Sequence, residues 1–404
     1  MPRIGIYIDV DDIRRFSVKA FSAPLDHAIG VTALVGRLIE DRDDELQCVR
    51  LYGADRSSWG KGDPWLRLDA RIWREEVPGS WCGVKATAQQ SAAVPIALAL
   101  DATMDVTERR CDTAIIVGHD ADLAPAVATI RGIGTGVGAC ETAGWSGVAI
   151  RGKDKGVHRT LDADDFAAIV NAGRAARLRS VFPNSGHRSD SPATPTTIVT
   201  AHRHPASVRG VFVGGTQASR RFAVFVDYRD LIDGSLRAFP DSEEGPLELS
   251  PLRLAERIVA REQGGELSLV VVSDARPSRE RDRDGHTAVG ARAERWTRED
   301  ERVRAHLRPL QVIDGRPAPK GIGTTLALEA ALALRGGRCD VAVLASADAT
   351  LRSAVELLQV RFGRGAIKVA SWWSPTHRRK IPQPAGAWHH RLDETDWQAA
   401  LVRP

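Results

Sequence analysis

The chain has 404 residues and a formal net charge of +4, with 43% apolar and 27% charged residues. This length exceeds what one hydrophobic core usually supports, so we expect two domains of ordinary globular composition. The five cysteines, an odd number without a C-x-x-C pair, argue against both a disulfide framework and a zinc site. No apolar run reaches the roughly 20 residues of a membrane-spanning helix, so we expect a cytoplasmic protein without membrane contact.

The chain contains the same series of segments twice. RCDTAIIVGHDADLAPAV begins at residue 110 and RCDVAVLASADATLRSAV at residue 338, an offset of 228 (338−110). Other blocks recur in the same order, including the openings IGIYID and FAVFVD, which chance does not explain. We expect one domain over 1–172 and a second over 220–404. The basic stretch 173–219 is rich in Pro, Ser and Thr and cannot bury a core, so it is predicted to be a flexible linker.

In chain order, each copy alternates apolar runs with helical patterns. The runs IGIYID, LQCVRLYG and TAIIVGHD in the first copy correspond to FAVFVD, LSLVVVSD and VAVLASAD in the second. Such continuous apolar runs are typical of parallel strands buried on both faces. The alternation predicts an α/β fold with two doubly wound domains, each a central, mainly parallel sheet flanked by helices. The stretch 275–304 mixes charges without a helical stripe, so we expect an exposed loop there.

Acidic side chains follow the predicted strands of both copies. Asp9 ends the first strand, Asp120 and Asp122 follow a later one, and Asp101 lies on the helix between them. Since parallel strands bring their carboxyl ends to one edge of a sheet, we expect these four acids to gather. A set of carboxylates suits Mg²⁺ or Mn²⁺, so they are predicted as the metal ligands and catalytic residues. The second-copy equivalents are Asp227, Glu329 and Asp348.

These blocks resemble the NYN domain, a branch of the PIN-like nucleases that includes the LabA-like bacterial proteins. The family has an apolar strand and Asp, then a spacer and Asn, and here Asp12 and Asp230 stand at the Asn position. Lys320 matches the start of the family's Lys-Gly-Val-Asp helix, although Gly323 replaces its Asp. The family block Ser-Gly-Asp-x-Asp-Phe keeps both acids in the first copy, whereas Thr350 replaces the second acid in the other.

The resemblance implies a PIN-like fold in both copies and a metal-dependent nuclease that hydrolyses phosphodiester bonds. It implies a ribonuclease acting on single-stranded or structured RNA, with single-stranded DNA left open as a substrate. The metal ions would generate a hydroxide-like nucleophile and stabilise charge on the reacting phosphorus. The first copy keeps all four acids and is expected to be the active one, with Asp12, Asp230 and Lys320 as auxiliary residues. Two assemblies stay open, a pseudo-dimer of the two copies within one chain and a homodimer of chains.

The tail SWWSPTHRRKIPQPAGAW interleaves aromatic and basic residues, a pattern that suits unpaired bases and their phosphates. The predicted nucleic-acid-binding residues are Trp372, Trp373, Arg378, Arg379 and Lys380. The alternative is an edge loop whose tryptophans pack inward. Two other functions are also open: a non-catalytic scaffold of degraded nuclease domains that binds nucleic acid or protein, and a haloacid-dehalogenase-type phosphatase in which Asp9 is the nucleophile.

Overall fold

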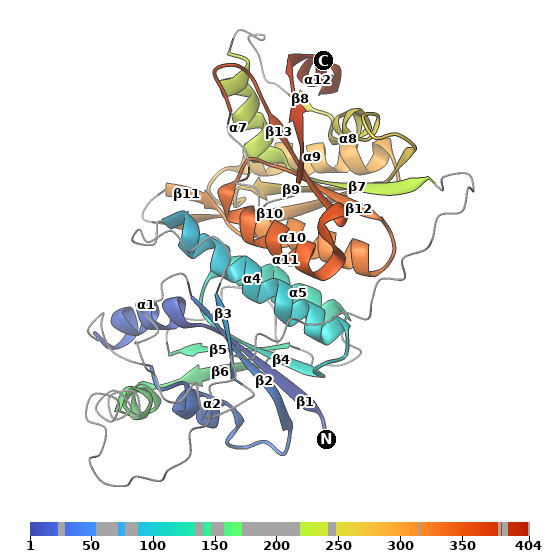
Figure 1. The fold of residues 1–404 in the computed structure, drawn as a ribbon. Coiled ribbons are helices and arrows are strands. Elements are labelled where there is room, and N and C mark those ends of the chain that lie inside the picture. Colours follow the sequence, from blue (N-terminus) through green and yellow to red (C-terminus); the bar gives the residue numbers. More distant parts are fainter. Residues whose placement is uncertain are drawn as a thin grey trace, which may run out of the picture.

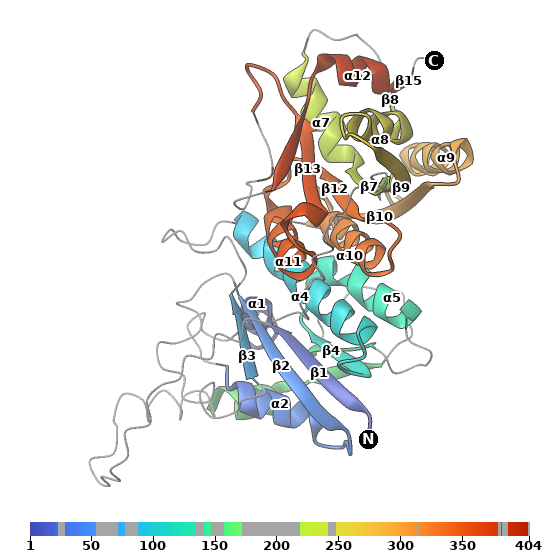
Figure 2. The same ribbon diagram turned by 45° about the vertical axis from the view of Figure 1, so that its right-hand side comes forward.

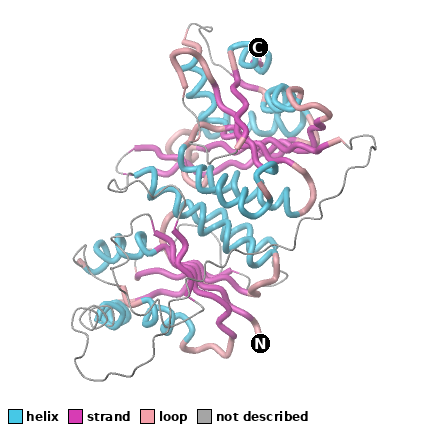
Figure 3. The backbone as a smooth tube through the Cα atoms, viewed as in Figure 1, coloured by secondary structure: helices cyan, strands magenta, loops and turns pink. Residues whose placement is uncertain are grey.

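The described residues form two mainly parallel β-sheets, each with helices on both faces, and one short antiparallel pair of strands (Figures 1 and 3). The predicted α/β architecture with parallel sheets flanked by helices is confirmed at this level. The computed structural model describes residues 1–22, 29–53, 72–76, 88–133, 140–146, 157–171, 219–240, 248–313, 316–378, 381 and 387–402. Apart from residue 219, the predicted linker lies outside these ranges. None of the described helices combines the length and apolarity needed to cross a membrane.

The first sheet has the order β3-β2-β1-β4-β5-β6, and all its described pairs are parallel. Its strands are β1 Arg3–Asp9, β2 Glu45–Gly53, β3 Ile72–Glu76, β4 Thr113–Val117, β5 Cys140–Trp145 and β6 His158–Leu161. Its helices are α1 Val10–Phe21, α2 Val31–Ile39, α4 Ala88–Thr107, α5 Ala124–Ile133 and the 3₁₀ turn η2 Ala121–Leu123. Alternate residues of β1 face opposite sides: Ile6 and Ile8 pack toward α1 and α2, and Tyr7 packs toward α4.

The second sheet repeats this order as β10-β9-β7-β12-β13-β14, with β11 added antiparallel at the β10 edge. Its strands are β7 Arg220–Asp227, β9 Gly265–Arg276, β10 Val303–Ile313, β11 Arg316–Pro319, β12 Val341–Ala345, β13 Ile367–Trp372 and β14 Trp388–Leu392. Its outer face carries α7 Tyr228–Ala238, α8 Pro251–Val259, α9 Arg283–Glu299 and α12 Glu394–Ala400. Its inner face carries α10 Ile322–Arg335 and α11 Arg352–Phe362. The remaining elements are β8 Glu248–Leu249, β15 Leu401–Val402, η3 Ala349–Leu351 and η4 Arg364–Ala366.

Most of the charged stretch 275–304 is helical, which corrects the expected loop. Helix α9 covers the outer face of the second sheet through a narrow buried stripe of Gly290, Ala293 and Trp296, spaced three residues apart. The Trp296 ring lies 4.5 Å from the ring of Tyr228, centroid to centroid. The mixed charges occupy the wide solvent-facing side of α9. Because only a narrow stripe of the helix is buried, the sequence shows no clear helical spacing of apolar residues.

The two repeats pack against each other through α4, α10 and α11 (Figure 2). Their buried side chains form one continuous hydrophobic core that reaches from Tyr7 in the first sheet to Phe225 in the second. Leu98 of α4 and Leu326 of α10 belong to this shared core and are both fully buried. Small residues are frequent in α4 and α10, and they allow the two helices to approach closely.

Candidate functional site

The first repeat places Asp9 and Asp12 at the carboxyl end of β1. The Asp9 carboxylate caps α1 by accepting a hydrogen bond from the Asp12 backbone N–H at 2.9 Å. Burial raises the pKa of Asp9 well above its ordinary value, and the nearby negative charge of Asp12 raises it further. The Asp12 carboxylate accepts a hydrogen bond from the His119 backbone N–H and pairs with Arg15. Arg15 also lies 3.9 Å from Asp120.

The second repeat supplies a cation to the acids of the first repeat, Asp9, Asp12, Asp120 and Asp122, which we call the first acidic edge. The Lys320 ammonium lies 2.7 Å from one Asp122 oxygen and 3.3 Å from Asp120. The Gly321 backbone N–H donates to the other oxygen of Asp122. Together with Arg15, these contacts mean that side chains of the chain itself balance much of the charge on the first-repeat acids.

Asp101 does not contact the other three acids predicted as metal ligands. Its carboxylate accepts a hydrogen bond from the Tyr52 hydroxyl at 3.0 Å and lies 3.4 Å from Arg50. Arg361 of the second repeat lies 3.9 Å from it. Within the described ranges, no group of three or more acidic, histidine or cysteine side chains is placed to hold a metal ion. The predicted Mg²⁺ or Mn²⁺ therefore stays a prediction.

The second repeat has the corresponding acids at the carboxyl end of β7. Asp227 caps α7 by accepting from the Asp230 backbone N–H at 3.1 Å. The Ser346 hydroxyl donates to Asp230 at 3.0 Å, and Asp348 accepts from the Thr350 backbone N–H at 2.9 Å. Burial raises the pKa of Asp227 well above its ordinary value, and repulsion from Asp230 adds to the shift. A protonated Asp227 can donate a hydrogen bond, and an ionised one attracts a cation.

Glu329, predicted as a second-repeat equivalent, does not contact these acids. It lies on α10, where its carboxylate is 3.5 Å from His306 and 3.8 Å from Arg338. Glu329 and Asp101 each sit on a helix whose inner face contacts the other repeat. Their cationic neighbours include Arg50 and His306 on strands and Arg361 on a distant helix, which single-sequence spacing does not show.

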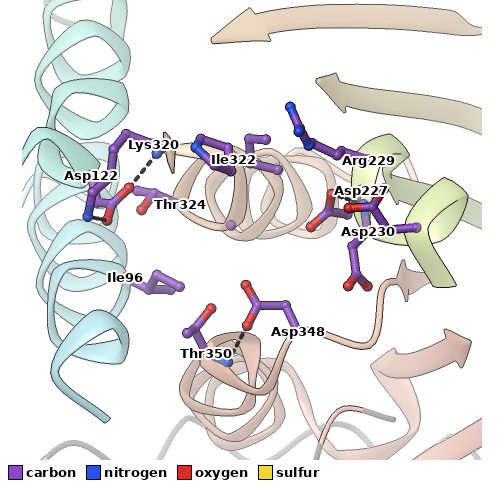
Figure 4. A pocket seen from close by; sticks show the side chains of 14 residues that line it. Ile96, Asp122, Asp227, Arg229, Asp230, Lys320, Ile322, Thr324, Asp348 and Thr350 are labelled. Atoms are coloured by element: carbon purple, nitrogen blue, oxygen red, sulfur yellow. Dashed lines mark hydrogen bonds and ion pairs between the residues drawn. The ribbon is translucent and has the colours of Figure 1, made fainter. Parts of the chain in front are cut away.

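A cavity of about 410 Å³ opens beside the second-repeat acids (Figure 4). Its size lies within the range of small-molecule pockets. The lining is Ile96, Asp122, Asp227, Arg229, Asp230, Asp233, Pro319, Lys320, Gly321, Ile322, Gly323, Thr324, Asp348 and Thr350. The first two residues belong to the first repeat and the others to the second, so both repeats build the cavity.

Charge reversals at two positions separate the acids at the ends of β1 and β7, because Asp11 corresponds to Arg229 (11+218) and Arg15 corresponds to Asp233. The offset between the opening strands is 218 (227−9), so Arg15 of the first repeat corresponds to Asp233 of the second (15+218). Arg15 pairs with Asp12, whereas Asp233 lines the cavity beside Asp230. The position that neutralises the first edge therefore adds negative charge to the second. The sequence contains this signal, and it is visible once the repeats are aligned with their separate offsets.

The structure buries one of the predicted nucleic-acid-binding residues of the aromatic tail, Trp372. Trp372 is 2% exposed, and its indole N–H donates to the Leu231 carbonyl at 2.7 Å, so its ring cannot stack on a base. Trp373 is half-buried, with Arg391 5.8 Å from its ring centroid. Arg378 is exposed, and Arg379 and Lys380 lie outside the described residues. RNA or single-stranded DNA as a partner stays a prediction.

No family model matches the chain, and no curated protein matches it. Similar solved structures include a putative UDP-N-acetylglucosamine 2-epimerase from Listeria monocytogenes, with 10% identity and a TM-score of 0.23 over 91% of this chain and 78% of that chain. The glycosyltransferase SnogD from Streptomyces nogalater has 13% identity and a TM-score of 0.20 over 99% of this chain and 90% of that chain. At such TM-scores neither protein's activity carries over to this chain.

These findings correct the family assignment. No family model supports the short motifs that carried the resemblance to NYN and PIN-like nucleases. On these findings the predicted tandem NYN, metal-dependent ribonuclease is wrong, and its alternatives, the nuclease-derived scaffold and the phosphatase, gain no support. The contacts give a physical reason: Asp122 is paired with Lys320 and Asp101 with Arg50, so the four acids form no open set.

Proposed function

We propose that this protein binds a small organic cation in the cavity of the second repeat. The observation that carries the proposal is the replacement of Arg15 by Asp233 at the equivalent position of that repeat. Within the described part of the chain, no ion pair joins Asp227, Asp230 or Asp348 to a cation of the protein. These carboxylates outnumber Arg229, the cation at this end of the cavity, and therefore attract a positive charge from outside. The burial of Asp227 reduces the screening of that attraction by water.

The shape of the site favours an organic cation over a bare metal ion. A cavity of about 410 Å³ is far larger than one ion, and metal binding requires three or more ligands in close geometry. An ammonium group has three N–H donors and tolerates carboxylates that lie apart. Ile96 and Ile322 contribute apolar lining that suits the carbon chain of an amine.

Binding should strengthen as pH rises. Burial and the charge of Asp230 raise the pKa of Asp227, so at lower pH this acid holds a proton that a bound cation must displace. Deprotonation of Asp227 at higher pH removes that cost. For an amine that stays charged over the range tested, the dissociation constant is therefore expected to fall between pH 5 and pH 8.

Calorimetric titration of the full chain with putrescine, a diamine, tests the proposal. Asp348→Asn keeps the size of the side chain and removes its charge, and it should weaken binding about tenfold, or about 1.4 kcal/mol. Asp393→Asn is the matched control, because Asp393 caps α12 as Asp348 caps η3 but does not line the cavity. Titrations with MgCl₂ and MnCl₂ run in parallel. No putrescine binding, or equal effects of both variants, would contradict the proposal, and Mn²⁺ binding lost in Asp348→Asn would make a metal the occupant.

A further inference from the structure

We infer that the opposite end of the same cavity is an oxyanion subsite at the N-terminus of α10, which takes a phosphate or carboxylate group. The inference rests on the proposed function only for the cationic half of the ligand. Figure 4 shows Lys320, Ile322 and Thr324 at one end of the cavity and Asp227, Asp230 and Arg229 at the other, with Asp348 and Thr350 between them.

Helix α10 begins without a side-chain cap. Its N-cap is Gly321, whose φ of +81° is a left-handed conformation that glycine adopts without strain. The first backbone hydrogen bond within the helix runs from the Thr325 N–H to the Gly321 carbonyl at 2.9 Å. The N–H groups of Ile322, Gly323 and Thr324 precede that bond and have no partner within the helix. Such N–H groups, together with the helix dipole, favour an anion.

The Thr324 hydroxyl is the second and independent observation. Thr324 lines the cavity and is 1% exposed, and its hydroxyl oxygen has no hydrogen-bond partner among the described residues. A buried hydroxyl without a partner costs about 1–3 kcal/mol, and native structures rarely leave one unsatisfied. The next residue shows the ordinary outcome, because the Thr325 hydroxyl donates to the Gly321 carbonyl at 2.7 Å. An oxygen of a bound anion would supply the partner that Thr324 lacks.

The charges around this end are compatible with an anion. Lys320 is the cation that lines the cavity at this end. Asp122 is the opposing acid at this end, and its two oxygens accept from Lys320 and from the Gly321 N–H. Asp122 is already paired, whereas the three N–H groups that follow have no partner within the helix and the Thr324 hydroxyl has none among the described residues, so these groups are available to a ligand. The cavity therefore fits a small molecule that carries an oxyanion at one end and a cation at the other.

The test compares ligands that carry one charged group or both. Inorganic phosphate, acetate, putrescine and phosphoethanolamine are titrated into the full chain, which separates a phosphate from a carboxylate ligand. Thr324→Val preserves shape and removes only the hydroxyl, and we expect it to lower the ratio of phosphate to putrescine affinity about tenfold. Phosphoethanolamine should bind more tightly than either single-group probe, because one molecule fills both ends.

Thr103→Val is the matched control. Thr103 lies in α4, is fully buried and also has a hydroxyl without a partner among the described residues, but it does not line the cavity. Its substitution should leave phosphate affinity unchanged. Equal effects of the two Thr variants, or no binding of phosphate and acetate to the unaltered protein, would overturn the subsite. If phosphate binding depends on Thr324 while putrescine does not bind at all, the proposed cation site fails and the anion subsite stands.

Discussion

The two acidic edges differ although the same strands, helix caps and strand order build them. In the first repeat Arg15 and Lys320 pair with Asp12, Asp120 and Asp122. In the second repeat the corresponding acids border a cavity and have no ion-pair partner among the described residues. The comparison teaches that the strands and helix caps determine where the acidic side chains gather. A few neighbouring side chains determine whether those acids pair with cations of the protein or border a cavity that a ligand can enter.

The largest expected effect tests whether the repeats share one core. Leu98→Ala and Leu326→Ala each leave a cavity in the layer between the sheets, which should cost about 2–5 kcal/mol of unfolding free energy. Denaturant unfolding followed by tryptophan fluorescence should show one transition that both variants shift. Val360→Ala, at an 80% exposed position of α11, should have little effect. Two transitions, each shifted by only one of the leucine variants, would show that the repeats unfold separately.

A second pair of substitutions compares equivalent tryptophans. The indole N–H of Trp145 donates to the Ile13 carbonyl at 2.7 Å, and that of Trp372 donates to Leu231 at the same distance. Trp145→Phe and Trp372→Phe each remove this hydrogen bond and part of a buried ring, so each should destabilise the protein by about 1–3 kcal/mol in thermal unfolding. Trp388→Phe, at a 63% exposed position, serves as the control. A neutral Trp372→Phe would argue that this ring is not part of the core.

Restoring the first-repeat charge in the second repeat should close the cation site. Asp233→Arg places a guanidinium where Arg15 stands in the other copy, and it should weaken putrescine binding at least about tenfold, or about 1.4 kcal/mol. Asp233 is exposed, so the substitution should leave the fold intact. Glu301→Arg makes the same change of charge at an exposed position outside the cavity. If both variants weaken binding equally in calorimetry, the effect comes from net charge and not from the site.

The smallest effect is a change in pH dependence. Burial raises the folded-state pKa of Asp9 and Asp227, so the folded state holds protons that the unfolded chain has lost. Their contribution to stability therefore falls as pH rises from the ordinary carboxyl value of 3.8 through the raised value. Asp9→Asn and Asp227→Asn should flatten this slope in urea unfolding between pH 4 and 8, and stability at pH 8 should increase.

An acid with the opposite shift gives the control for the sign. Hydrogen bonds from the Arg302 side chain lower the pKa of Asp300 to about 2. Asp300 therefore stabilises the folded state above its ordinary pKa, and this contribution is lost as pH falls toward about 2. Asp300→Asn should lower stability at neutral pH, in contrast to Asp227→Asn. The same sign in both variants would contradict the assigned protonation states.

Much of the frame could be predicted from the sequence. Apolar runs that end in an acidic residue, such as the one ending at Asp9, form central parallel strands. The same series of runs occurs in both repeats, so the sequence predicts the same series of strands in each. Ser250 caps α8, with Pro251 in its first turn, as that pattern predicts. Local signals of this kind act within a few residues, and one sequence is enough to detect them.

The site was less predictable because its contacts join distant residues. Lys320 and Asp122 are separated by 198 positions, and nothing near either residue indicates the other. The position of Asp101 between Asp9 and Asp120 in the sequence predicted a metal ligand. In the structure Asp101 pairs instead with Arg50, which lies in the middle of β2. Trp372 stands beside basic residues in the sequence and nevertheless lies in the core, because alternate residues of β13 face opposite sides of the sheet.

The contact between Lys320 and Asp122 has a consequence for symmetry. In a dimer of identical chains related by a twofold axis, such a contact would occur twice. Here the offset of 228 places Ala92 opposite Lys320 in the alignment (320−228) and Thr350 opposite Asp122 (122+228), and these two residues cannot form an ion pair. Covalent fusion of the copies allows each half to change alone. One molecule can therefore hold the acids of the first repeat in ion pairs and leave those of the second repeat beside a cavity. Identical subunits in a symmetric dimer cannot divide these roles.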